Sequence, residues 1–150
     1  MNTVPKWLVF ASIINMIGNS FGTVVAFQQN LVADWGGFLK GQDVLRDFLG
    51  FKGTALSAPL PFLLIQLMVT LLVLRPDRSR SIGIAALTVI GLVYTLGQGG
   101  EPIGLKLLSP GGFDLAQAIA FIVNEASAII MLVMGIRAWR ISHSSQAIER

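Results

Sequence analysis

Four long apolar stretches alternate with shorter polar segments along the chain. A bilayer core about 30 Å thick needs roughly 20 mostly apolar residues to be crossed by one helix. Helix is the expected state, because unpaired backbone groups in hydrocarbon are strongly unfavourable. The pattern predicts an all-α polytopic membrane protein whose four transmembrane helices form one bundle and one domain, residues 1–150. The predicted spans are residues 7–27, 54–74, 81–97 and 113–136.

The four predicted spans differ in their polar residues. The first three contain no charged side chain, and the third reaches full length only if the glycine-rich residues after it continue the helix. Pro59 and Pro61 are expected in the first turns of the second helix, where a missing N–H costs little. The fourth span contains Asp114, which is expected to cap its first turn, and Glu125, near its middle.

The connection between the first two spans, residues 28–53, carries an apolar pattern of its own. Asp43, Arg46 and Asp47 fall on one face of a possible helix, opposite an apolar face. We expect a short amphipathic helix at the membrane interface, which either caps the bundle or offers a surface to a partner. The apolar face comprises Val44, Leu45, Phe48, Leu49 and Phe51, and Trp35 and Phe38 are expected to anchor the approach to it.

Composition excludes a soluble domain. Hydrophobic residues make up 53% of the chain and charged residues 13%, about half of the roughly 25% usual in soluble proteins. The mean hydropathy is +0.70, so a nucleic-acid-binding module is not expected despite the net charge of +3. The absence of cysteine excludes disulfides and thiol catalysis, and the one histidine, His143, excludes a bis-His haem within one chain.

Basic residues predict the orientation. Cytoplasmic loops carry an excess of Lys and Arg, and most of the 11 basic residues fall at one end of the predicted bundle. We therefore expect both termini in the cytoplasm, with the protein in a bacterial inner (plasma) membrane. Trp7, Tyr94 and Trp139 are expected to be interface anchors at the ends of their spans. The basic residues at the cytoplasmic end are Lys6, Arg75, Arg78, Arg80, Arg137, Arg140 and Arg150.

The first span has a polar face with small residues. Ser12, Asn15 and Asn19 lie close together on a helix. Small residues at every fourth position let two helix backbones approach closely, and this span carries them at Gly18, Gly22 and Ala26. The face is expected to pack within the bundle, with an interface to a second copy or a foreign subunit as the alternative.

The fourth span carries the candidate ligand or ion site. Gln117, Asn124 and Glu125 fall within an arc of about 100° on a helix, and the other spans contain no counter-ion. We expect an uncharged Glu125 that hydrogen-bonds Asn124, or Asn15, Asn19 and Gln66 across the bundle. Two alternatives stay open: Glu125 is a proton, cation or polar-ligand site together with Gln117, Asn124, Asn15 and Asn19, or it forms a salt bridge between subunits.

The chain contains no recognisable catalytic or metal-binding constellation, and its pattern identifies no cofactor. We expect a non-enzymatic accessory or scaffold subunit of a larger membrane complex, with lipid or an apolar ligand between its helices. Its partners would be the lipid bilayer and other membrane subunits or a second copy, and not nucleic acid. The alternative is a small homo-oligomeric proton- or cation-coupled transporter or channel that uses Glu125. A membrane enzyme for a lipid-soluble substrate is the least favoured class.

Overall fold

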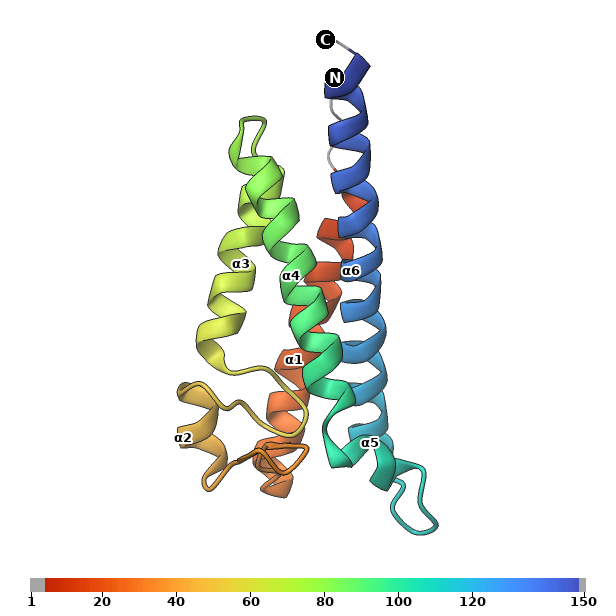
Figure 1. The fold of residues 1–150 in the computed structure, drawn as a ribbon. Coiled ribbons are helices and arrows are strands. Elements are labelled where there is room, and N and C mark those ends of the chain that lie inside the picture. The colour runs from red at the N-terminus through yellow and green to blue at the C-terminus, as the bar shows by residue number, and fades with distance from the viewer. Residues whose placement is uncertain (1–4, 149–150) are drawn as a thin grey trace.

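The computed structural model describes residues 5–148, with side chains through residue 141, and it is almost entirely helical (Figure 1). Three helices are long and apolar enough to cross a membrane: α1, α4 and the part of α6 at Leu115–Ile141. The fourth apolar helix, α3, has only 15 residues, a length of roughly 22 Å. The long helices are α1 (Lys6–Gln29), α3 (Leu60–Leu74), α4 (Ser79–Gly99) and α6 (Leu115–Ile148).

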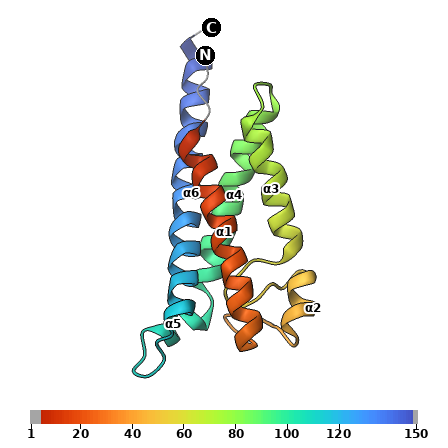
Figure 2. The same cartoon turned by 180° about the vertical axis from the view of Figure 1, so that it is seen from behind.

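The short elements lie together at one end of the bundle (Figures 1 and 2). The other end holds the start of α1, the α3–α4 turn and the C-terminal part of α6. The basic residues assigned to one side by the sequence therefore share one end, although Arg150 lies outside the described residues. The short elements are the antiparallel hairpin of β1 (Asp34–Trp35) and β2 (Leu39–Lys40), α2 (Val44–Leu49) and α5 (Pro102–Leu107).

Small residues bring the long helices together. A Cβ atom at Gly83 would lie 2.8 Å from the Val73 backbone nitrogen, so α3 and α4 are in close contact near their connecting turn. A Cβ at Gly91 would lie 2.8 Å from the Leu132 nitrogen, where α4 packs on α6. One apolar core cluster fills the space among these helices: Leu8, Ala11, Val69, Val73, Ile84, Leu87 and Met131.

The second apolar helix begins later than the sequence pattern predicts. It starts at Leu60 rather than Thr54, and residues 53–59 form a buried non-helical segment, the entry segment. Ala58 precedes Pro59, and a residue before proline is disfavoured in the helical conformation. Pro61 lies in the first turn, as expected. The predicted cap of the last helix is confirmed, because the Gln117 N–H donates to Asp114 Oδ1 at 2.9 Å.

The predicted helix in the first connection is present but short. Its buried residues are Val44 and Asp47, so the expected separation of an apolar from a polar face is only partial. Asp47 faces inward because its Oδ2 accepts the Gln42 N–H at 2.6 Å and the Asp43 N–H at 3.1 Å. Three of the expected apolar residues are exposed on the outside: Leu45, Leu49 and Phe51.

The contact between α1 and the entry segment leads to a first prediction. Gly22→Ala should lower the free energy of unfolding by about 1–3 kcal/mol, because the new Cβ would collide with the Leu56 carbonyl oxygen. Thermal unfolding in detergent measures this. The matched control is Gly99→Ala, whose Cβ meets nothing within 4 Å. Equal stability of the two variants would contradict the close packing.

Candidate functional site

Two asparagines on α1 connect this helix to α6. Asn15 Nδ2 donates to the Asn124 carbonyl at 3.1 Å and to Ser127 Oγ at 3.0 Å. Asn19 Nδ2 donates to Asn15 Oδ1 at 3.0 Å. Both asparagines and Asn124 are at most 2% exposed. The structure thus brings three of the five predicted site residues into one buried hydrogen-bond network.

The network also includes α3. Gln66 Nε2 donates hydrogen bonds to Ser12 Oγ at 3.1 Å and to Asn15 Oδ1 at 3.2 Å. Ser12 and Thr70 share a hydrogen bond of 2.7 Å. Polar residues of three helices therefore meet in the interior, where most of their neutral amide and hydroxyl groups pair with one another without the cost of burying a charge. Two acceptors of this network, Gln66 Oε1 and Asn124 Oδ1, are buried without a partner in the described structure.

The same asparagines satisfy the backbone of the entry segment. The Ala58 N–H donates to Asn19 Oδ1 at 2.7 Å, and Asn124 Nδ2 donates to the Leu56 carbonyl at 2.7 Å. Thr23 Oγ1 donates to Ser57 Oγ at 2.9 Å. Non-helical backbone at membrane depth is tolerated where protein groups satisfy it. These contacts give the asparagines a structural role within their own chain.

The small residues of α1 lie beside these partners. A side chain at Gly18 would collide with Asn124 Oδ1, and one at Gly22 would collide with the Leu56 carbonyl. Ala26, one turn further, is fully buried. The small-residue face of α1 therefore packs against α6 and the entry segment of its own chain.

The remaining two predicted site residues lie apart from this network. Gln117 Nε2 donates to Gln29 Oε1 on α1. Glu125 is half-buried, and its Oε2 is buried without a hydrogen-bond partner in the described part of the chain. The expected hydrogen bonds from Glu125 to Asn124, Asn15, Asn19 or Gln66 do not form, because Asn124 points to the α1 side and Glu125 is the next residue around the helix.

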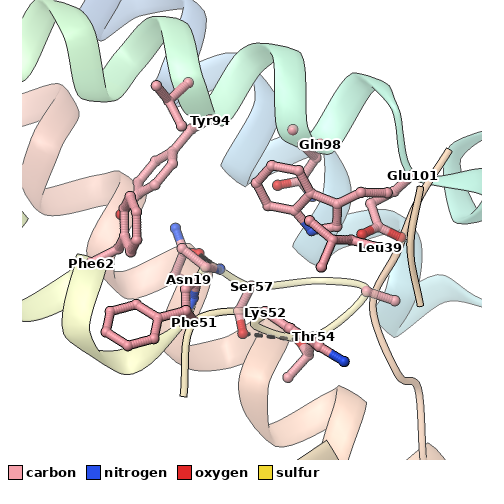
Figure 3. Close-up of a pocket in the computed structure, with 16 residues that line it drawn as sticks. Asn19, Leu39, Phe51, Lys52, Thr54, Ser57, Phe62, Tyr94, Gln98 and Glu101 are labelled. Atoms are coloured by element: carbon pink, nitrogen blue, oxygen red, sulfur yellow. Dashed lines mark hydrogen bonds between the residues drawn. The ribbon is translucent and has the colours of Figure 1, made fainter. Parts of the chain in front are cut away.

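A cavity of about 380 Å³ lies where α3 and α4 separate, at the end opposite their connecting turn (Figure 3). The entry segment and the β-hairpin complete its walls. Its lining is mainly aromatic and aliphatic. The lining residues are Asn19, Trp35, Leu39, Phe51, Lys52, Thr54, Ala55, Ser57, Ala58, Pro59, Phe62, Val93, Tyr94, Gly97, Gln98 and Glu101.

Helix α4 supplies two polar side chains of the cavity wall, Tyr94 and Gln98. Tyr94 is 9% exposed and its ring points toward Phe62 (Figure 3). The expected role of Tyr94 as an interface anchor is therefore wrong, because the divergence of α3 from α4 leaves interior space for its ring. Tyr94 Oη and Gln98 Nε2 are both buried, and neither has a hydrogen-bond partner among the side chains that the structure describes.

The two charged residues of the wall have protein partners. Both Glu101 carboxylate oxygens accept the Asp34 N–H, at 3.0 and 3.2 Å, which holds the β-hairpin against the end of α4. Burial raises the pKa of Glu101 to about 7. Lys52 Nζ donates to the Lys40 carbonyl at 3.1 Å and lies 4.0 Å from Asp47 Oδ1.

Comparison with known proteins identifies no relative: no protein-family model, curated protein or solved structure matches this chain. Within the described residues, no three His, Cys, Asp or Glu side chains come together as a metal site. The cavity is therefore the candidate site, and its lining residues define the contacts that it offers to a ligand.

The cavity was not predicted from the sequence. Tyr94, Gln98 and Glu101 occupy positions i, i+4 and i+7, a spacing that places them on one side of a helix. This spacing indicated a polar stripe along α4 that continues just beyond its end at Gly99. The sequence around Trp35 gave no indication that it lines the cavity. Its place in the wall depends on the hairpin fold and on the close approach of its ring to Gly97, where a Cβ would lie 3.2 Å from the ring.

Removing Asn19 Oδ1, which accepts the Ala58 N–H of the entry segment, should destabilise the fold. Asn19→Ala leaves the Ala58 N–H unsatisfied, and a buried unpaired group costs about 1–3 kcal/mol. Unfolding in detergent should show a loss of this size. Ser20→Ala is the matched control, since exposed Ser20 bonds only the Met16 carbonyl of its own helix. If the Asn19 variant is as stable as the Ser20 variant, the structural role assigned to Asn19 is contradicted.

Glu101 should make stability depend on pH. Its pKa is raised from 4.5 to about 7 in the folded state, so the folded protein holds a proton that the unfolded chain releases. The stabilising contribution is complete below pH 4.5 and is lost as pH rises through about 7. The melting temperature of the wild type should fall across this window, and that of Glu101→Gln should fall less. Parallel curves for the two proteins would refute the assignment.

Proposed function

We propose that this protein is an integral membrane protein that holds a lipid or another apolar ligand in the cavity between α3 and α4. The cavity itself is the observation that carries the proposal. Its volume of about 380 Å³ lies in the usual range for ligand sites, which are mostly apolar with a few placed polar groups. Trp35, Phe62 and Val93 supply the apolar walls.

The membrane setting is supported by the outer surface. Large apolar side chains are exposed on every long helix, for example Ile17 at 60%, Met68 at 67% and Ile122 at 62%. Soluble monomers rarely expose such continuous apolar surface. We propose that all four long helices cross a bacterial inner membrane, with α3 and the entry segment together completing the second crossing.

Both termini are proposed to be cytoplasmic. The support is the clustering of Lys6, Arg75, Arg78 and Arg80 at one end of the bundle, since basic residues favour the cytoplasmic side. The cavity and the short elements would then lie at the outer side. There the connection exposes Phe38 at 95% and Phe51 at 78%.

A role as a non-enzymatic accessory subunit accounts for these exposed aromatic residues. Exposed apolar groups next to a ligand cavity are typical of surfaces that meet a partner or lipid. The described cavity wall contains no histidine and no paired carboxylates, the groups that most often carry out proton transfer in enzymes. The proposal is therefore ligand binding within a membrane assembly.

The ligand can be tested with a variant that fills the cavity. Protein extracted in a mild detergent should retain a stoichiometric apolar molecule, detected by native mass spectrometry and by extraction into organic solvent. Val93→Phe should lose most of it, because the larger ring occupies the cavity. The control is Val89→Phe, one turn away at a position that is 57% exposed and outside the cavity. Equal retention by both variants would contradict the proposal.

A transporter that uses Glu125 is the second candidate function. The observation that favours it is the buried, unpartnered Oε2 of Glu125 on a membrane-length helix, since intramembrane carboxyl groups often mark ion or proton pathways. Glu125→Gln separates the two candidates. It should leave ligand retention unchanged if the cavity is the site, and it should abolish ion or proton flux in liposomes if the protein is a transporter.

A further inference from the structure

Two unpaired polar atoms on α4 restrict the chemistry of the ligand. Gln98 Nε2 can only donate hydrogen bonds, and Tyr94 Oη can donate one. Both atoms are buried and lack a partner in the described structure. Such atoms are costly to bury unless something pairs with them. Since both residues line the cavity, a ligand inside it is placed to accept their hydrogen bonds.

The two donors lie on the same side of α4. Residues four apart lie about 6 Å from each other along a helix axis, on the same side of it. Figure 3 shows Tyr94 on the side of Phe62, with Gln98 further along α4 toward Glu101. Aromatic and aliphatic side chains surround both positions. An oxygen-bearing head group could thus meet the donors while an apolar body contacts Phe62, Val93 and Trp35.

The charges of the cavity favour an uncharged ligand. Both oxygens of Glu101 accept the Asp34 N–H, and Lys52 is held by the Lys40 carbonyl and by Asp47. Both charged groups therefore already have protein partners, and burial raises the pKa of Glu101 to about 7, which reduces the charge that it offers to a ligand. An ionised head group would therefore lose its hydration in this cavity without a charged partner to replace it.

We infer that the ligand is an uncharged lipid-soluble molecule with a hydrogen-bond-accepting carbonyl oxygen, as in an ester or ketone, which Tyr94 and Gln98 bind by donation. This inference rests on the proposed function, because it names the ligand class of the same cavity. It adds a specificity that an apolar cavity alone would not have. Each hydrogen bond should strengthen binding about three- to tenfold.

Binding can be followed through Trp35, which lines the cavity. The chain has three tryptophans, and replacing Trp7 and Trp139 with phenylalanine leaves Trp35 as the only reporter. Brominated chains quench tryptophan fluorescence at short range. Three probes of equal chain length would be titrated into nanodiscs that contain the protein: dibromostearic acid methyl ester, dibromo-octadecane and the quaternary amine dibromooctadecyl-trimethylammonium.

The methyl ester should quench Trp35 with an affinity about tenfold higher than that of the hydrocarbon or the ammonium probe. Tyr94→Phe and Gln98→Leu should each reduce this preference about three- to tenfold, with little effect on the hydrocarbon. Thr95→Val is the control on the same helix, because Thr95 bonds the Gly91 carbonyl and does not line the cavity. Val93→Phe should weaken quenching by all three probes.

The outcomes separate this inference from the proposed function. Equal quenching by the ester and the hydrocarbon, abolished by Val93→Phe, would overturn the carbonyl inference and leave an apolar binding site. Stronger quenching by the ammonium probe would also overturn it. If all three probes quench Trp35 and Val93→Phe leaves this quenching unchanged, the probes reach Trp35 only from the bulk lipid. Both the inference and the proposed function would then fail.

Discussion

The fold depends on satisfying a stretch of non-helical backbone inside a bundle of apolar helices. The entry segment lies among α1, α3 and α6, where water cannot satisfy its polar groups. Asn19 accepts the Ala58 N–H and Asn124 donates to the Leu56 carbonyl. A neutral amide offers a donor and an acceptor together, without the larger cost of a buried charge. The buried asparagines thus have hydrogen-bond partners in the backbone of their own chain.

The entry segment also accounts for the space that the cavity occupies. Because Pro59 delays the start of α3, the chain reaches this helix from the side of α1 and not in line with its axis. Near the connecting turn, Gly83 lets α4 touch the backbone of Val73. At the far end no such contact forms, and the cavity lies between Phe62 and Tyr94. The hydrogen-bond network therefore supports one wall of the candidate site.

The wall of the cavity formed by the hairpin depends on a titratable group and not on neutral amides. The hairpin that carries Trp35 is attached to the end of α4 through the Asp34 N–H and the Glu101 carboxylate. Burial opposes the charge of Glu101 while this hydrogen bond favours it, and burial is the larger effect. Since the pKa of about 7 lies near neutrality, this attachment is the part of the site most sensitive to pH. The inner network contains only neutral groups and lacks this sensitivity.

The sequence by itself determined the helical class, the approximate positions of the long helices and the cap at Asp114, because each follows from local apolar patterning and local backbone chemistry. It also located Asn15, Asn19 and Asn124 as buried polar residues, but it could not choose their partners. Those partners, and the separation of Glu125 from them, depend on how α1 and α6 rotate against each other. The cavity was decided by tertiary structure alone, because it requires the late start of α3, the Gly83 contact and the hairpin with Trp35 to occur together in space.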